Sequence, residues 1–408
     1  MPASAGAQAP DAALAHAREL LRSTPLIDGH NDLPWEIRRS ESHPRDVAAY
    51  DLRTPSPKHT DLDRLKRGQV AAQFWSIYVD GEMKDSGYAR VQLEQFDIAR
   101  RMVARYPDRL ALALTADDIE REVKRGRLAS LLGMEGGHAI ENSLGALRSY
   151  YALGARYMTL THNVTLDWAD AALDSARHQG LTEFGREVVR EMNRLGMLVD
   201  LSHVSPAVMS DALDVAQAPV IFSHSAARAL VNHPRNVPDS ILARLARNGG
   251  VVMVTFVPQF VSTEFMVWEE ASTAEWKAAG TAISDSAARR AHMKEWEAAH
   301  PAPAATLAQV ADHIDHVRKV AGVDHVGIGS DFDGIDHVPA GLEDVSKFPE
   351  LFAELIRRGW NDGDLKKLAG RNLLRALHGA EKTAARLQRE REPSTRTIEE
   401  LDGRPPAS

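Results

Sequence analysis

Eight short apolar runs recur along the chain, and each is followed by a longer stretch in which apolar residues have helical spacing. Near-continuous apolar, β-branched runs are typical of parallel strands that are covered on both faces. The alternation therefore predicts an α/β protein with a parallel sheet. The runs occupy residues 25–30, 70–77, 128–135, 157–162, 197–203, 219–224, 250–256 and 326–331.

Two of the intervening stretches carry clear helix signals. Residues 181–195 (LTEFGREVVREMNRL) have apolar residues at helical spacing and contain a threonine suited to capping, and residues 205–216 begin with Ser-Pro, a good cap and first-turn pair. Eight strand–helix units predict a (β/α)8 TIM-type barrel, whose usual size of about 200 to over 400 residues accommodates this chain.

One interval is longer than a barrel unit requires. About seventy residues separate the seventh and eighth runs, and residues 262–300 are rich in Ala, Glu and Trp. We expect a helical insertion there, at about 258–306. A loop after a strand lies on the C-terminal face of a barrel, where active sites occur, so this insertion is a candidate lid or subunit contact. A packed elaboration without function is the alternative.

The rest of the chain is expected to form a single domain over residues 11–388. Residues 1–10 are a small-residue lead expected to be disordered, and 389–408 form a polar tail with three prolines. The region around residues 11–19 is polar where a signal peptide needs an apolar core, and no run of 18 apolar residues occurs. These features predict a cytoplasmic protein without a membrane partner.

Composition excludes several classes of function. The 408 residues are 44% hydrophobic and 26% charged, which is typical of a globular protein. A net charge of −8 leaves no electrostatic basis for binding nucleic acid. Cysteine is absent, which excludes disulfides, a thiol nucleophile and iron–sulfur clusters. Any metal must therefore be held by Asp, Glu or the 17 histidines.

Six of the eight runs end on His, Glu or Asp, and a barrel would bring these residues to one mouth. His30 and Asp32 are two positions apart on an extended strand, so both face the same way, although a hydrogen-bonded turn would also explain the pair. His203 and His224 each close a run in a Ser-His context. Glu135 follows an apolar run and precedes two glycines, and a buried carboxylate needs either cations or an arginine partner.

Together these five residues predict a two-metal cage of three imidazoles and two carboxylates, which suits zinc. Two cations about 3.5–4 Å apart activate a bridging water as hydroxide and polarise a carbonyl or phosphoryl group, so hydrolysis is the expected reaction class. The ligands are His30, Asp32, Glu135, His203 and His224.

Three further residues are candidates for catalysis or substrate binding. Asp331 ends the eighth run and is suited to transfer a proton between the water and the leaving group, with a turn-forming role as the alternative. His162 ends the fourth run and is suited to stabilise an oxyanion. Arg235 lies in a loop after the sixth run, where it would bind a substrate carboxylate or form a loop salt bridge. His138 and Asp333 are expected to be structural.

These motifs, in this order, resemble the membrane dipeptidase (renal dipeptidase) family of zinc metallopeptidases in the amidohydrolase superfamily. The resemblance extends from about residue 25 to about residue 377. Its carriers are DGHNDLPW (28–35), MEGGH (134–138), RYMTLTHN (156–163), GREVVREMNRLGMLVDLSH (185–203), PVIFSHSAARA (219–229), HPRNVPD (233–239) and GIGSDFDG (327–334).

The resemblance implies a binuclear zinc dipeptidase with two Zn²⁺ ions per subunit, bridged by Glu135 and a water or hydroxide. It assigns His30 and Asp32 to one zinc, His203 and His224 to the other, His162 and Arg235 to substrate binding and Asp331 to proton transfer. It also implies cleavage of free dipeptides, including many with a C-terminal D-residue.

This chain departs from the secreted, disulfide-linked and lipid-anchored mammalian members, because it has no cysteine and no recognisable anchor segment. It is more similar to the soluble bacterial branch, whose members are often dimers, so a homodimer is one option. The alternatives are another amidohydrolase reaction, such as N-acyl-amino-acid hydrolysis or deamination, or a catalytically silent metal-binding barrel.

Overall fold

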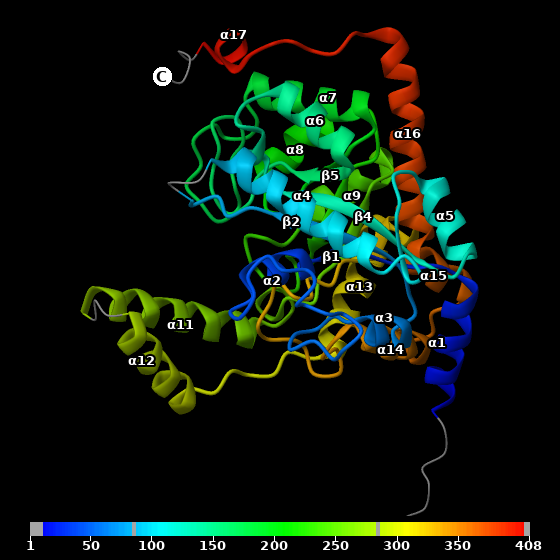
Figure 1. Ribbon diagram of the computed structural model, residues 1–408, viewed down its shortest axis with the longest axis vertical. Coiled ribbons are helices and arrows are strands. Elements are labelled where there is room, and N and C mark those ends of the chain that lie inside the picture. Colours follow the sequence, from blue (N-terminus) through cyan, green and yellow to red (C-terminus); the bar gives the residue numbers. More distant parts are fainter. Residues whose placement is uncertain (1–10, 84–86, 283–285, 404–408) are drawn as a thin grey trace, which may run out of the picture.

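Eight parallel strands close into a barrel at the centre of the molecule (Figure 1). The computed structural model describes residues 11–83, 87–282 and 286–403, so the lead predicted to be disordered at 1–10 lies outside the described residues. Each barrel strand overlaps one predicted run, and the predicted TIM-type barrel is confirmed. The strands are β1 (Leu26–Asn31), β2 (Val70–Tyr78), β4 (Leu128–Glu135), β5 (Ala155–Thr159), β6 (Leu198–Asp200), β7 (Ile221–Ser225), β8 (Val251–Val254) and β9 (Val326–Ile328).

Each strand of the barrel pairs with the next one along the chain, and β9 returns to β1. A ninth strand, β3 (Leu110–Leu112), pairs only with β4, along the first residues of β4. The sequence analysis missed β3 because three residues are too few to show a periodicity.

Helices cover the outside of the barrel. The predicted helices are present as α7 (Glu183–Leu195) and α8 (Pro206–Val215), and each begins at the expected cap. The Thr182 side chain accepts a hydrogen bond from the Gly185 amide, and Ser205 accepts one from the Val208 amide. The other helices outside the barrel are α1 (Ala12–Ser23), α2 (Leu33–Arg39), α3 (Leu62–Arg67), α4 (Tyr88–Arg105), α5 (Ala116–Lys124), α6 (Leu144–Leu153), α9 (Asp239–Asn248), α13 (Leu307–Ala321), α14 (Phe348–Arg357), α15 (Asp362–Lys366), α16 (Asn372–Glu390) and α17 (Ile398–Asp402).

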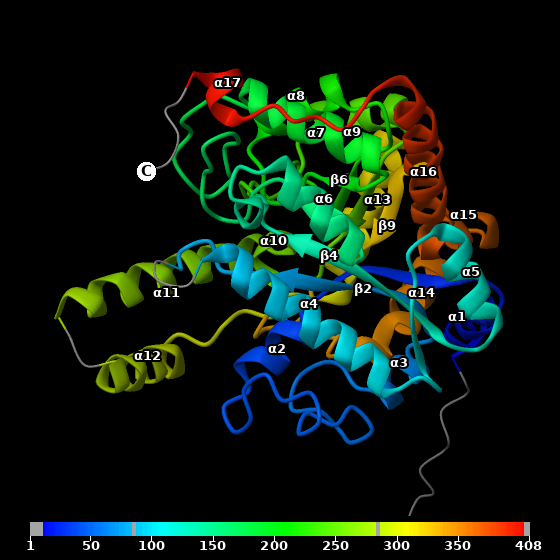
Figure 2. The ribbon, with the colours of Figure 1, turned by 45° about the horizontal axis from the view of Figure 1, so that its top comes forward.

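The long interval between β8 and β9 contains a helical hairpin that projects from the barrel (Figures 1 and 2). It begins with the short helix α10 (Pro258–Val261) and continues with α11 (Thr263–Ala282) and α12 (Ser286–Ala299). Phe265 is buried at the base of α11, whereas Val267 and Trp276 are exposed. Among the described residues, no helix combines the length and the apolar character that crossing a bilayer requires.

Glycines let parts of the barrel approach one another closely. A Cβ atom on Gly329 would lie 1.8 Å from the backbone oxygen of Ser223 in β7. A Cβ on Gly133 would lie 2.0 Å from Cζ of Tyr157, so the Tyr157 ring occupies the space that a side chain would take. The Gly133 contact sets the position of Tyr157 beneath the mouth of the barrel.

We expect Gly329→Ala to lower the free energy of unfolding by about 3 kcal/mol, because the added methyl group meets backbone that cannot move aside. Urea denaturation followed by circular dichroism measures this change. Gly145→Ala is the matched control, since its nearest neighbour is the Ser143 hydroxyl at 3.4 Å, and its stability should be equal or slightly higher. Equal stability of Gly329→Ala and the wild type would contradict the close approach of β9 to β7.

Candidate metal centre and substrate cleft

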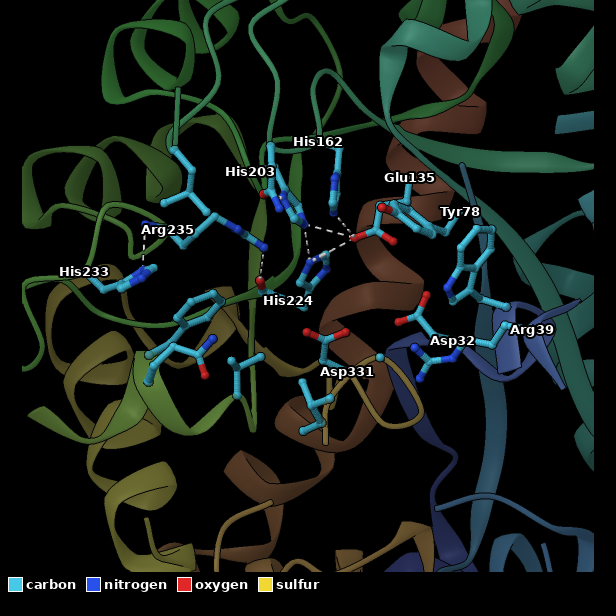
Figure 3. Close-up of a pocket in the computed structure, with 18 residues that line it drawn as sticks. Asp32, Arg39, Tyr78, Glu135, His162, His203, His224, His233, Arg235 and Asp331 are labelled. Atoms are coloured by element: carbon cyan, nitrogen blue, oxygen red, sulfur yellow. Dashed lines mark hydrogen bonds and ion pairs between the residues drawn. The ribbon is translucent and has the colours of Figure 1, made fainter. Parts of the chain in front are cut away.

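The polar residues that end the predicted runs meet at one end of the barrel. Glu135 is the last residue of β4, His224 lies in β7, and His203 follows β6. His30, in β1, is fully buried. Parallel strands have their carboxyl ends on the same side, which is why residues far apart in the sequence share this mouth. All of them except His30 line a cleft of about 370 Å³, shown in Figure 3.

Glu135 is the centre of this cluster, and each of its carboxylate oxygens faces imidazole nitrogens. Oε1 lies 3.0 Å from His203 Nε2 and 3.4 Å from His224 Nε2. Oε2 lies 3.4 Å from His30 Nε2, which is 3.2 Å from Asp32 Oδ2. The candidate ligand atoms form three triads, of which two share Glu135, one with His30 and Asp32 and one with His203 and His224, and the third consists of His30, His224 and Asp331.

The other ring nitrogen of each histidine is held by an oxygen. The partners of Nδ1 are the Tyr157 hydroxyl for His30 at 2.9 Å, Asn163 Oδ1 for His203 at 3.0 Å and Ser223 Oγ for His224 at 2.8 Å. Because an amide oxygen only accepts, His203 Nδ1 must carry the proton. The Tyr157 hydroxyl donates to the Gly29 carbonyl at 3.2 Å, so its oxygen accepts from His30 in the same way. These contacts direct the Nε2 atoms of the imidazoles toward Glu135.

The protonation states favour metal binding. Burial and the charge of Arg235 lower the pKa of His203 well below its usual value, and burial lowers that of His224 likewise, so both rings are neutral. Burial by itself would raise the pKa of Glu135, but the charge of His30 outweighs it and holds this pKa well below the usual value. Although burial would lower it, the charges of Glu135 and Asp32 raise the pKa of His30 well above its usual value, so this ring must lose a proton when it binds a metal. Neutral imidazoles and an ionised carboxylate are the forms that bind metals.

Two contacts among the candidate donor atoms are explained better by bound metal ions than by hydrogen bonds within the protein. His30 Nε2 is buried and has no hydrogen-bond partner among the described residues. The Nε2 atoms of His203 and His224 are only 2.8 Å apart, which leaves room for a proton on one of them but not on both. A cation between these atoms would relieve both features, and the set of imidazoles and carboxylates suits a first-row metal such as zinc.

Arg235 lies in the same cleft and forms no ion pair with another described residue. Its side chain is 1% exposed, its Nη1 has no hydrogen-bond partner among the described residues, and its guanidinium packs 5.2 Å from the Phe260 ring centroid. Burial lowers its pKa to about 10, so it remains charged at neutral pH. Because a buried unpaired cation is costly, this position is suited to a ligand anion.

The remaining predicted residues line the cleft close to the cluster. Asp331 Oδ1 is 3.8 Å from His30 Nε2, and His162 Nε2 is 3.9 Å from Glu135 Oε1. Asp331 and His203 both adopt left-handed backbone, with φ of 69° and 72°. Such conformations are strained for residues with a side chain and persist where the surroundings impose them.

The two residues expected to be structural lie outside the cluster. His138 Nε2 is bonded to the Val79 carbonyl at 2.9 Å. Asp333 is fully buried and accepts a hydrogen bond from the His59 amide at 2.8 Å.

Sequence reasoning missed the side chains that orient the histidines and those that form the outer walls. Asn163 directly follows His162 and Ser223 directly precedes His224, so their place beside candidate ligands was the only available signal. Tyr157 gave no signal, because its hydroxyl reaches a histidine 127 positions away. The wall residues are Trp35, Arg39, Tyr78, Leu173, His233, Val257, Gln259, Phe260 and Ile335.

Comparison with known proteins gives a consistent result over most of the chain. The family model for membrane dipeptidases, peptidase family M19, matches residues 14–391. The dipeptidase verJ of Clonostachys rogersoniana is 41% identical over 386 residues, which cover 92% of this chain and 89% of that protein.

Two solved structures share the fold over nearly their whole length. The probable dipeptidase PvdM of Pseudomonas aeruginosa has a TM-score of 0.78 at 25% identity, covering 92% of this chain and 100% of that one. A metallopeptidase of Rhodobacter sphaeroides, with a bound phosphinate mimic of the dipeptide L-Ala-D-Ala, has a TM-score of 0.72 at 25% identity, covering 88% and 99%.

We expect Glu135→Gln to weaken metal binding at least tenfold, because it removes the charge that both triads share. Chelated protein would be titrated with Zn²⁺ against a chromophoric chelator, and retained metal would be counted by mass spectrometry. His138→Gln, a change at a buried histidine outside the cluster, should bind metal like the wild type. Equal binding by Glu135→Gln and the wild type would remove Glu135 from the metal centre.

Proposed function

Because the chain belongs to the membrane dipeptidase family, and is therefore a metallopeptidase that hydrolyses dipeptides, we propose that it does so with two zinc ions at the mouth of its barrel. The observation that carries this proposal is the pair of ligand triads that share Glu135. In this proposal His30 and Asp32 would hold one ion, His203 and His224 would hold the other, and Glu135 would be shared by both. Two such ions would lower the pKa of a water molecule and polarise the scissile carbonyl.

Asp331 is the proposed proton-transfer residue. It accepts a proton from the water as the water oxygen bonds to the carbonyl carbon, and it returns that proton to the amide nitrogen as the C–N bond breaks. Its position in the cleft, 3.8 Å from His30 Nε2, supports this assignment because the reacting water must lie beside the same ligands.

His162 is proposed to stabilise the negative charge that develops on the carbonyl oxygen. It lines the cleft 3.9 Å from Glu135 Oε1, and its ring lies 4.8 Å from that of Tyr78 and 4.3 Å from that of His203. Burial lowers its pKa, which leaves a neutral imidazole whose N–H donates without adding a charge to the site.

Arg235 is proposed to bind the C-terminal carboxylate of the dipeptide. Its Nη1, which has no hydrogen-bond partner among the described residues, supports this role, since a carboxylate pairs with N–H donors of a guanidinium. Holding that carboxylate beside the metal centre leaves room for only one residue after the scissile bond, which would explain a restriction to dipeptides. The mimic of L-Ala-D-Ala bound by the Rhodobacter sphaeroides relative supports acceptance of a C-terminal D-residue here as well.

We expect Arg235→Met to lower kcat/KM for free dipeptides roughly 100-fold, mainly through KM, because it removes the partner of the carboxylate. The test compares L-L and L-D dipeptides with their C-amides and N-acetyl derivatives, using chelated enzyme with and without added zinc. Wild-type enzyme should be zinc-dependent and should discriminate strongly against the amides, whereas the variant should barely discriminate.

Undiminished discrimination against amides by Arg235→Met would exclude Arg235 as the carboxylate-binding residue. Efficient cleavage of the N-acetyl compounds by the wild type would instead favour N-acyl-amino-acid hydrolysis on the same residues.

We expect Asp331→Asn to retain the bound metal but to lose between about 10²-fold and 10⁴-fold in kcat, because an amide cannot carry the proton. Metal content and steady-state kinetics on the same preparation separate the two effects. Turnover close to that of the wild type would show that another group transfers the proton.

A further inference from the structure

Arg39 is a second arginine that lines the cleft, and the function proposed above does not use it. It is the last residue of α2, which begins directly after Asp32. Its side chain is 44% exposed, in contrast to the fully buried Arg235. Figure 3 shows the two arginines on opposite sides of the candidate metal ligands, with Asp32 and Tyr78 on the side of Arg39.

Only some of the N–H groups of the Arg39 guanidinium form hydrogen bonds within the protein. Its Nε donates to Oε1 of Glu36 at 2.7 Å, and its Nη2 contacts the same oxygen. Glu36 is nearly buried, so it is a firm anchor, and Lys58 lies 4.0 Å from that oxygen. These bonds leave Nη1 of Arg39 without a hydrogen bond to a described residue, and a guanidinium carries five N–H donors in all.

The opposite positions of the two arginines define a direction for the substrate. If Arg235 binds the C-terminal carboxylate and the scissile carbonyl lies beside the metal ligands, the N-terminal residue lies against the wall formed by Trp35, Tyr78 and Arg39. The charges of Asp32 and Glu135, which also face this region, are offset by metal ions when these are bound. Arg39 is then the positively charged residue of this wall that can pair with a substrate side chain.

We propose that Arg39 binds an acidic side chain on the N-terminal residue of the dipeptide, so that the enzyme prefers N-terminal Glu or Asp to their amides. The inference rests on the function proposed above, because Arg235 and the metal centre set the direction of the substrate. The partial exposure of Arg39 and its bond to Glu36 weaken the interaction, so we expect a preference of about tenfold.

The test compares kcat/KM for Glu-Ala and Gln-Ala, which differ in charge but hardly in size. We expect the wild-type ratio of Glu-Ala to Gln-Ala to be about ten and the ratio for Arg39→Met to fall to about one. The ratio of Ala-Glu to Ala-Gln should be the same in both proteins, because that side chain lies at the other end of the cleft.

Arg38→Met is the matched control. Arg38 is the neighbouring residue of α2, but its Nη2 bonds to Glu94 at 2.8 Å, and it does not line the cleft. It should keep the wild-type ratio of Glu-Ala to Gln-Ala. A wild-type ratio near one, or a ratio that Arg39→Met leaves unchanged, would overturn the role of Arg39 while leaving the dipeptidase assignment in place.

A binding measurement tests Arg39 independently of turnover. Calorimetric titration of zinc-loaded Asp331→Asn with Glu-Ala and with Gln-Ala should give a Kd ratio of about ten in favour of Glu-Ala, and the added change Arg39→Met should remove it. If wild-type enzyme cleaved no dipeptide, the proposed function would fail. The Kd ratio would still decide whether Arg39 recognises an acidic side chain, and equal Kd values would overturn the inference.

Discussion

The buried carboxylate of Glu135 is the constraint on which the rest of the site depends. A charge at 5% exposure is strongly unfavourable unless it is compensated, and here the compensation comes from three imidazoles and the hydroxyl of Ser76, which donates at 3.0 Å. Because its two oxygens face different histidines, one side chain links two triads of ligands. Glu135 at the end of β4 therefore contacts side chains from β1, β7 and the segment after β6, and these contacts add to the hydrogen bonds between strands in fixing the mouth of the barrel.

The packing inside the barrel supports this arrangement from below. The absence of a side chain at Gly133 lets the Tyr157 ring cross β4, and the Tyr157 hydroxyl then holds Nδ1 of His30. The position of His30 in β1 therefore depends on Tyr157 in β5, whose ring position in turn depends on Gly133 in β4. The same principle applies to His203 and His224, whose rings are oriented by neighbours that do not themselves reach the centre.

The charges around the cleft explain why a small zwitterionic substrate suits this member of the membrane dipeptidase family. Arg235 is buried and forms no ion pair with another described residue, whereas Arg39 is partly exposed and pairs with Glu36. In the proposed roles, Arg235 binds a group that every free dipeptide carries, and Arg39 binds a group that only some dipeptides carry. General recognition and selectivity would then lie on opposite sides of one cleft.

The sequence by itself determined the eight barrel strands, the caps of α7 and α8 and the set of polar residues at the strand ends, because these follow from local periodicity and from the rule that parallel strands end on one side. Their spacing also carried the family resemblance, which the comparisons confirmed. The tertiary structure alone decided that Tyr157 meets His30, that Arg39 and Arg235 lie on opposite sides of one cleft and that α11 and α12 project from the barrel. The three-residue strand β3 could not be predicted from the sequence either. Such features depend on contacts between distant residues, on the direction of individual side chains and on pairing too short to leave a pattern.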